Sequence, residues 1–175
     1  MKDNKQQLYT DSFMEYYEKY SDDIFRFCMV KVRNRDVALD ITQDTFMKFW
    51  EYIIKDTVIE NERPLLYRIA NNYVIDRYRK KKDVLVENFT DPDYHQLFEH
   101  DEVSRAINKI DGKQALLLLD ELPETMREII NLRFVHDFSI SEIADVLDIE
   151  ANTASVNLHR GLKKLRELIA SYEQR

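Results

Sequence analysis

The 175-residue sequence contains only two glycines, three prolines and one cysteine. A β-sandwich or barrel needs a turn about every 8–12 residues, so this scarcity of turn-forming residues argues against all-β folds. The single cysteine, Cys28, excludes an internal disulfide and a thiolate metal cluster, and is typical of a reducing compartment. The longest apolar run, residues 115–119, is far shorter than the roughly 18 residues of a membrane span. We therefore expect an all-α, cytoplasmic protein without a membrane span.

Charge is distributed unevenly along the chain, whose formal net charge is −7. Residues 61–82 carry seven basic and two acidic side chains, and residues 151–175 carry five and two. Between them, residues 83–124 carry three and eleven. Salt confines the field of a patch to about 10 Å, so two basic patches are compatible with nucleic-acid binding despite the net acidity. Solvated helix faces explain either patch equally well on this pattern alone.

Apolar residues spaced by three or four positions predict helices over about residues 10–32, 34–55 and 62–82, preceded by a loose tail at residues 1–9. Residues 83–112 form an acidic linker that can hold a short helix at 101–110. Helices over residues 114–120 and 124–135 follow. The expected architecture is two small helical domains, residues 10–82 and 113–175, joined by this linker.

The C-terminal part of the chain has the pattern of a helix-turn-helix. Ser139 and Glu142 form a predicted capping box that opens a short helix. Residues 148–150 then form a turn into a longer helix over about residues 151–172. The second helix of such a motif can enter the ~12 Å major groove of DNA. An ordinary antiparallel helical hairpin fits the same periodicity equally well.

Three stretches, in this order, resemble the conserved regions of bacterial sigma factors. Residues 38–50 (ALDITQDTFMKFW) resemble the core-binding helix of region two, and residues 66–82, which begin LYRIANN, resemble its promoter-opening helix. Residues 119–128, 141–144 (SEIA) and 158–166 (LHRGLKKLR) resemble region four. On these motifs the chain is similar to the short, two-domain extracytoplasmic-function (ECF) type of the sigma-70 family.

The resemblance implies a transcription initiation factor that binds core RNA polymerase, directs it to promoters and helps to melt the minus-ten element. It implies no catalytic residue, no cofactor and no metal, and it adds an anti-sigma factor as an inhibitory partner. A conventional dimeric helix-turn-helix regulator remains the alternative, although it leaves the region-two motifs unexplained. An enzyme has no support, because the sequence has no Ser/His/Asp grouping and no nucleotide-binding glycine loop.

The resemblance also implies three sets of contact residues. A carboxylate–amide stripe beside a large aromatic suits a cationic, amphipathic helix of core polymerase. The residues of this set are Asp40, Gln43, Asp44 and Trp50. Opening DNA without ATP requires capture of unstacked bases by amide or carboxylate groups and of phosphates by cations. The minus-ten set is Asn72 and Asp76 with Arg77, Arg79, Lys80, Lys81 and Lys82 on phosphates. The minus-thirty-five set is Thr153, Ser155, Val156, Asn157, His159 and Arg160, followed by Lys163 and Lys164.

Several positions depart from the family pattern or allow a purely structural role. Ser155 and Asn157 stand where many members have Lys or Arg, and Asp148 replaces the usual turn glycine. Glu150 stands where a serine cap is usual, which leaves Asn152 as a candidate cap. Trp50 and Tyr73 can instead belong to the core, and we expect Cys28 to be buried. The Asp and His side chains between residues 91 and 101 lie on a polar stretch, and we expect them to bind no metal.

Overall fold

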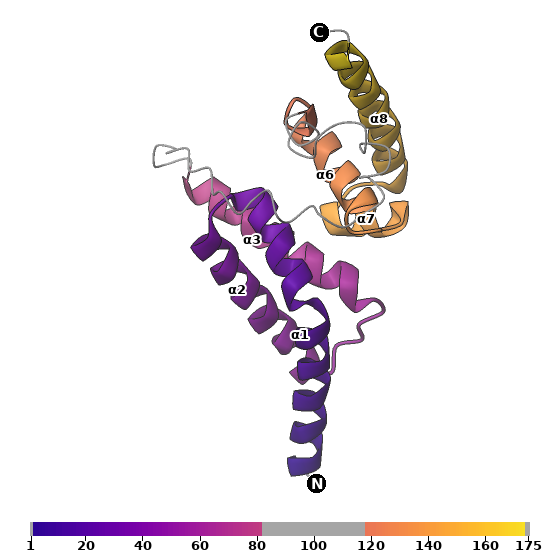
Figure 1. Cartoon of the computed structure of the whole chain (residues 1–175). Coiled ribbons are helices and arrows are strands. Elements are labelled where there is room, and N and C mark those ends of the chain that lie inside the picture. Colours follow the sequence, from indigo (N-terminus) through magenta and orange to yellow (C-terminus); the bar gives the residue numbers. More distant parts are fainter. Residues whose placement is uncertain (1, 82–117, 174–175) are drawn as a thin grey trace. The chain divides into compact units, whose positions relative to one another are not determined.

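The structure is a computed structural model that describes residues 2–81 and 118–173 (Figure 1). The described residues form helices and loops, and none of them lies in a strand. The chain divides into an N-terminal unit, Met1–Tyr94, and a C-terminal unit, His95–Arg175. The first contains helices α1 (Lys2–Val32), α2 (Arg35–Ile54) and α3 (Glu62–Lys81). The second contains α6 (Glu124–Phe134), α7 (Ile140–Leu147) and α8 (Ala151–Glu173).

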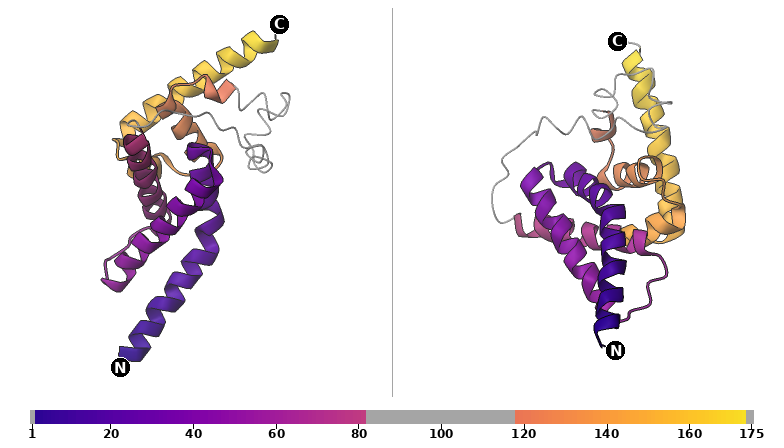
Figure 2. Two further views of the ribbon diagram at one scale, coloured as in Figure 1. Left: turned by 90° about the vertical axis from the view of Figure 1, so that its left-hand side faces the viewer. Right: turned by 60° about the horizontal axis from the view of Figure 1, so that its bottom comes forward.

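The N-terminal unit is a three-helix arrangement in which α1 packs along both α2 and α3, and α2 packs on α3 (Figure 2). Its centre is aromatic. Phe27 of α1 meets Tyr67 of α3 with ring centroids 5.0 Å apart, and Phe46 and Phe49 of α2 are fully buried. Cys28 is also buried, as expected, and burial raises the pKa of its thiol to about 12. Because its thiol stays protonated, Cys28 is an unreactive residue of the core.

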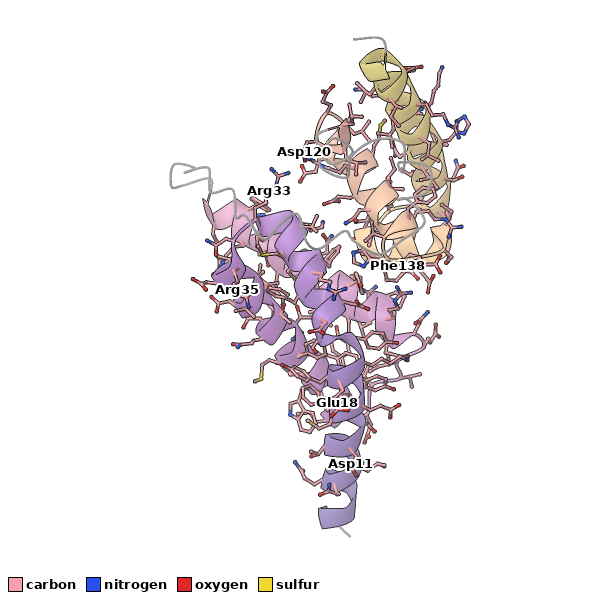
Figure 3. The ribbon with its side chains drawn as sticks, in the orientation of Figure 1. Asp11, Glu18, Arg33, Arg35, Asp120 and Phe138 are labelled. Carbon is pink, nitrogen blue, oxygen red and sulfur yellow. The ribbon has the colours of Figure 1, made fainter. Side chains whose placement is uncertain are left out.

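A short turn connects α1 to α2. Arg33 adopts a left-handed conformation with φ 49°, which ends α1. Asn34 then caps α2, because its side-chain oxygen accepts a hydrogen bond of 3.0 Å from the backbone N–H of Val37. Figure 3 labels Arg33 and Arg35 on either side of this turn. The start of the second helix at Asn34, predicted from the sequence, is confirmed.

The first residues of the chain differ from the sequence-based expectation. Residues 2–9 continue α1 as helix, whereas a loose tail was expected there. Lys5 and Tyr9 both bind Asp56, which follows α2: the Lys5 Nζ lies 2.6 Å from Oδ2 and the Tyr9 hydroxyl donates to Oδ1 at 2.5 Å. These long-range contacts tie the first turns of α1 to the end of α2, and no local sequence pattern signals them.

The C-terminal unit packs α8 across α6 and α7. Ile129 and Leu132 of α6, Ile143 and Val146 of α7, and Phe138, which is labelled in Figure 3, are fully buried. Leu165 of α8 joins a further cluster with Leu118, Leu122 and Ile130. The interruption expected between residues 120 and 124 is present, and α6 begins directly after Pro123.

Some predictions lie outside the described residues. They are the acidic linker at 83–112 with its short helix at 101–110, the first part of the helix predicted over 114–120, and the Asp and His side chains between residues 91 and 101, which we expect to bind no metal. Within the described ranges, no helix has the length and apolar character needed to cross a membrane.

Candidate functional site

The outer face of α2 presents a polar stripe. Asp40, Gln43 and Asp44 are all exposed, because they point away from the side on which Ala38, Thr42 and Phe46 are buried. Leu39 and Met47 are exposed on the same helix, and Met47 retains 65% of its accessible surface. An acidic and amide stripe with exposed apolar side chains is suited to binding a partner of opposite charge.

Trp50 lies at the end of this stripe and is half-buried. Its ring packs edge-on against Phe13 of α1, with centroids 5.3 Å apart. The indole is therefore held in place from one side while part of it remains accessible. Neither of the two roles considered from the sequence, a fully buried core residue or a free contact residue, describes it completely.

The polar face of α3 brings together three of the predicted minus-ten residues. At 100° per residue, Asn72, Asp76 and Arg79 fall within one sector of the helix, and all three side chains are exposed. Asp76 and Arg79 form an ion pair of 3.8 Å on this face. The opposite side of α3 is buried through Leu66, Tyr67, Ala70 and Val74. We call the outward sector, Asn72, Asp76 and Arg79, the α3 polar face.

Arg77 does not lie on the α3 polar face. Five residues separate it from Asn72, which corresponds to a rotation of about 140° around the helix. Its guanidinium instead meets the carboxylate of Asp40 on α2, at 3.3 Å between Nη2 and Oδ2. Two residues that the sequence analysis assigned to different partners thus contact each other.

The minus-ten set has three further basic residues, at positions 80 to 82. Lys80 is exposed, and Lys81 is the last residue of the helix. Lys82 lies outside the described residues. Tyr73 is half-buried, which favours its structural role, and Tyr78 is exposed but donates its hydroxyl to the backbone carbonyl of Lys31.

The helix-turn-helix of the C-terminal unit is present, with the predicted capping box of its first helix but without the predicted Asn152 cap of its second. Ser139 accepts a 3.3 Å hydrogen bond from the N–H of Glu142, whose carboxylate accepts from the N–H of Ser139 at 2.8 Å. Asp148 adopts φ 53° and ψ 50°, the left-handed conformation that ends many helices and that glycine adopts most readily. The helix that follows begins at Ala151, and the carbonyl of Glu150 accepts from the N–H of Ala154. Asn152 therefore lies in the first turn of α8 and does not cap it.

The outward face of α8 carries most of the predicted minus-thirty-five residues. Their exposed members are Thr153, Ser155, Val156, His159, Arg160, Lys163 and Lys164. Ala154 and Leu165 are buried on the opposite face. Asn157 is half-buried, and its amide donates to the carbonyl of Thr153 at 3.0 Å. Asn157 is therefore less available to a base edge than its position on the helix indicates.

Two sets of side-chain contacts were not predicted from the sequence. The contact between Asp40 and Arg77 joins residues 37 positions apart, and it could have been suspected from the helical angle of Arg77. No pattern in the sequence indicates the hydrogen bonds of Lys5 and Tyr9 to Asp56. Within the described ranges, no group of three or more His, Cys, Asp or Glu side chains is arranged to hold a metal ion.

Comparisons with known proteins match both units. The family described as Sigma-70 region 2 matches residues 16–84, and the family described as Sigma-70, region 4 matches residues 112–165. The ECF RNA polymerase sigma factor SigM of Bacillus subtilis (strain 168) is 31% identical over 157 residues, which cover 88% of this chain and 93% of SigM. SigW of the same organism is 29% identical over 174 residues, covering 90% of this chain and 88% of SigW.

Solved structures show the same fold. The sigma factor RpoE of Bartonella quintana, in complex with the anti-sigma factor NepR, matches with a TM-score of 0.68 at 21% identity and covers 91% of this chain and 97% of its own. CnrH, in complex with the cytosolic domain of CnrY, matches with a TM-score of 0.64 at 20% identity, over 93% of this chain and 90% of its own.

Proposed function

Because this chain belongs to the ECF sigma factors of the sigma-70 family, we propose that its N-terminal unit binds core RNA polymerase and opens promoter DNA while its C-terminal unit reads an upstream promoter element. Membership of the family makes the chain a transcription initiation factor. It does not favour the dimeric operator-binding regulator, which would have no use for a region-two match. The observation that carries the two roles of the N-terminal unit is its pair of separate polar faces, one on α2 and one on α3.

Membership of the family also suggests where this chain acts and which partners it has. Sigma factors are non-catalytic, and we propose that this chain likewise has no enzymatic activity and acts in the cytoplasm with the polymerase. We assign residues 10–82 to region two, 113–175 to region four and 83–112 to an acidic linker. RpoE, one of the similar structures, is bound by the anti-sigma factor NepR. We propose an anti-sigma partner for this chain too.

The α2 surface supports a contact with core polymerase through Asp40, Gln43, Asp44 and Trp50. Asp44 and Gln43 are exposed and form no hydrogen bond or ion pair in the described structure that would need to be broken. Trp50 is pre-positioned by Phe13, so little rotamer freedom is lost on binding. Such a rigid aromatic beside charged groups is typical of a binding hot spot.

This contact is tested by the affinity of purified core polymerase for single variants. Asp44→Lys reverses a charge and Trp50→Ala removes the aromatic; each should weaken binding at least tenfold, or about 1.4 kcal/mol. Asp22→Lys is the matched control, because Asp22 is exposed on the side of α1 away from the core. Unchanged affinity for both test variants would refute the assignment of this face.

The α3 polar face supports promoter opening. Asn72 offers an amide that can both donate to and accept from the edge of an unstacked base, and Asp76 offers a carboxylate acceptor. Arg79, Lys80 and, by sequence, Lys81 and Lys82 supply cations for the phosphates of the captured strand. Because Asn72, Asp76, Arg79 and Lys80 share one helix, base capture and backbone binding can occur together without ATP.

Opening is tested with a holoenzyme assembled from core polymerase and this chain on promoter DNA that carries a fluorescent base analogue in the minus-ten element. Asn72→Ala should lower the opened fraction at least tenfold and leave core binding unchanged. Gln7→Ala removes an exposed amide of α1 and serves as the control. Normal opening by Asn72→Ala would contradict the proposed role.

The outward face of α8 supports recognition of duplex DNA at the minus-thirty-five element. Thr153, Ser155, Val156, Asn157 and His159 belong to the first turns of α8, which in a helix-turn-helix approach base edges. Arg160 can contact guanine in a bidentate manner, and Lys163 and Lys164 are suited to phosphates. Arg160→Ala should cost about 1–3 kcal/mol and relax preference at one base pair, whereas Lys164→Ala should weaken binding to all sequences alike. Competition binding of the holoenzyme to point-mutated promoters distinguishes the two outcomes.

A further inference from the structure

Three polar contacts join the middle and the C-terminal half of α3 to α1 and α2. Arg77 pairs with Asp40 of α2 at 3.3 Å. Tyr78, its neighbour, donates its hydroxyl to the carbonyl of Lys31 at the end of α1. Nearly two turns earlier, the amide oxygen of Asn71 accepts from Nζ of Lys31 at 2.7 Å, and Asn71 is buried. None of the three residues lies on the α3 polar face: at 100° per residue they lie about 100–140° around the helix from Asn72, with Arg77 on one flank and Asn71 and Tyr78 on the other.

The contact of Arg77 has a consequence for its charge. A guanidinium engaged by a carboxylate is partly neutralised, and a phosphate would have to displace Asp40 to bind it in the same place. Arg79 differs, because it lies on the outward sector beside Asn72, and its pairing with Asp76 at 3.8 Å is longer. The two arginines, although only two residues apart, therefore occupy different environments.

On this basis we propose that Arg77 and Asp40 are positioning residues for promoter opening: their ion pair, with the Tyr78–Lys31 hydrogen bond, fixes the rotation of α3 so that Asn72 and Arg79 face the DNA. Arg77 is then not a phosphate contact, and Asp40 acts on opening through Arg77 in addition to its place on the α2 surface. The inference rests on the proposed function of the α3 polar face.

An exposed ion pair contributes little to global stability, since solvent screens it and both side chains lose rotamer freedom. Asp40 and Arg77 retain 62% and 44% of their side-chain surface. Their effect on the orientation of α3 is equally modest, and it adds to the packing of the buried side of this helix. A rotation of α3 by a fraction of a turn would carry the Asn72 amide past hydrogen-bond distance of a captured base, which is how a residue without DNA contact can control opening.

The salt dependence of DNA binding separates a phosphate contact from a positioning residue. The probe is a fork-junction DNA, single-stranded across the minus-ten element, of a promoter that the holoenzyme transcribes. Removing one phosphate contact lowers the slope of log affinity against log salt concentration by about 0.7 for single strands. We expect this change for Arg79→Ala and an unchanged slope for Arg77→Ala. On the fully duplex form of the same promoter, we expect about fivefold slower opening by Arg77→Ala. A slope reduced equally by both variants, or unimpaired opening by Arg77→Ala, would overturn the inference.

A double-mutant cycle tests the pair itself. Asp40→Asn, Arg77→Ala and the double variant are compared in preassembled holoenzyme at saturating core polymerase, so that weaker core binding does not enter the opening rate. If the two residues act as a unit, the double variant opens DNA no more slowly than Arg77→Ala alone. Multiplicative losses would refute the pairing. Failure of the proposed function would look different from failure of this inference. In that case Asn72→Ala would leave the opening rate unchanged and Arg79→Ala would leave the salt slope unchanged, whatever the effect of Arg77→Ala.

Discussion

Gly161 lies where α8 passes over α6, and it is the clearest case of a single residue that determines packing in the C-terminal unit. A Cβ atom at this position would lie 3.0 Å from Cδ1 of Ile130 and 3.2 Å from Cβ of Met126. Both distances are tighter than ordinary van der Waals contact, and the Met126 atom is fixed to the backbone of α6. The close approach of the two helices therefore depends on the absence of a side chain.

We predict that Gly161→Ala destabilises the C-terminal unit by about 1 kcal/mol, because overpacking of about 1–3 kcal/mol exceeds the gain in helix propensity. Hydrogen exchange of the α6 and α8 amides measures the effect. The pair Glu167→Ala and Glu167→Gly, at an exposed site of α8, gives the propensity difference alone. Stabilisation by Gly161→Ala to the same extent would show that the helices can move apart freely.

Asp56 is a second residue with a measurable signature. Two hydrogen bonds, a stronger influence from Lys5 and a weaker one from Tyr9, lower the pKa of the Asp56 carboxyl below its ordinary value of 3.8. The attachment of residues 2–9 is therefore fully present above about pH 4 and is lost as the pH falls through the folded-state pKa. In an NMR titration, the midpoint of Asp56 should lie below 3.8 and rise in Lys5→Ala with Tyr9→Phe. An unshifted midpoint in the wild-type chain would contradict the anchor.

At the scale of the elements, local signals predicted most of what the structure contains. Asn34 and the Ser139–Glu142 pair marked helix starts because a cap satisfies backbone groups of its own turn. The outward faces of α2, α3 and α8 followed from a period of 3.6 residues. Tertiary contacts were less accessible: no local pattern indicated the bonds of Lys5 and Tyr9 to Asp56, and the helical angle of Arg77 placed it off the α3 polar face without identifying Asp40 as its partner. Both involve partners more than 35 positions away.

The capping box of α7 gives a prediction at this scale. Ser139→Ala removes the acceptor for the N–H of Glu142 and should cost about 1 kcal/mol, with faster hydrogen exchange at the first amides of α7. Ser141→Ala, two residues further along and exposed, should have no comparable effect. Because α7 supports the start of α8, binding to the minus-thirty-five element should weaken in parallel. Equal exchange rates in the two variants would contradict the capping role.

At the scale of the whole molecule, the distribution of charge sets how the free chain meets DNA. The net charge is −7, and the basic segments 61–82 and 151–175 belong to different units. Repulsion from the acidic remainder should keep the free chain from binding duplex DNA tightly, whereas core polymerase presents both units to the promoter. We predict an affinity at least 100-fold lower for the free chain than for the holoenzyme, measured by fluorescence anisotropy at about 0.1 M salt. Tight duplex binding by the free chain would favour the alternative hypothesis of a dimeric helix-turn-helix regulator.

The central claim, that this chain starts transcription and opens DNA with the polar face of α3, is tested most directly by run-off transcription. Core polymerase from a matched source is supplied with a pool of promoters from the same genome, with and without the chain. We expect specific new transcripts with the wild-type chain and their loss with Asn72→Ala combined with Arg79→Ala, while binding to core polymerase is retained. The absence of new transcripts from the wild-type chain, or undiminished transcription by the double variant, would contradict the account.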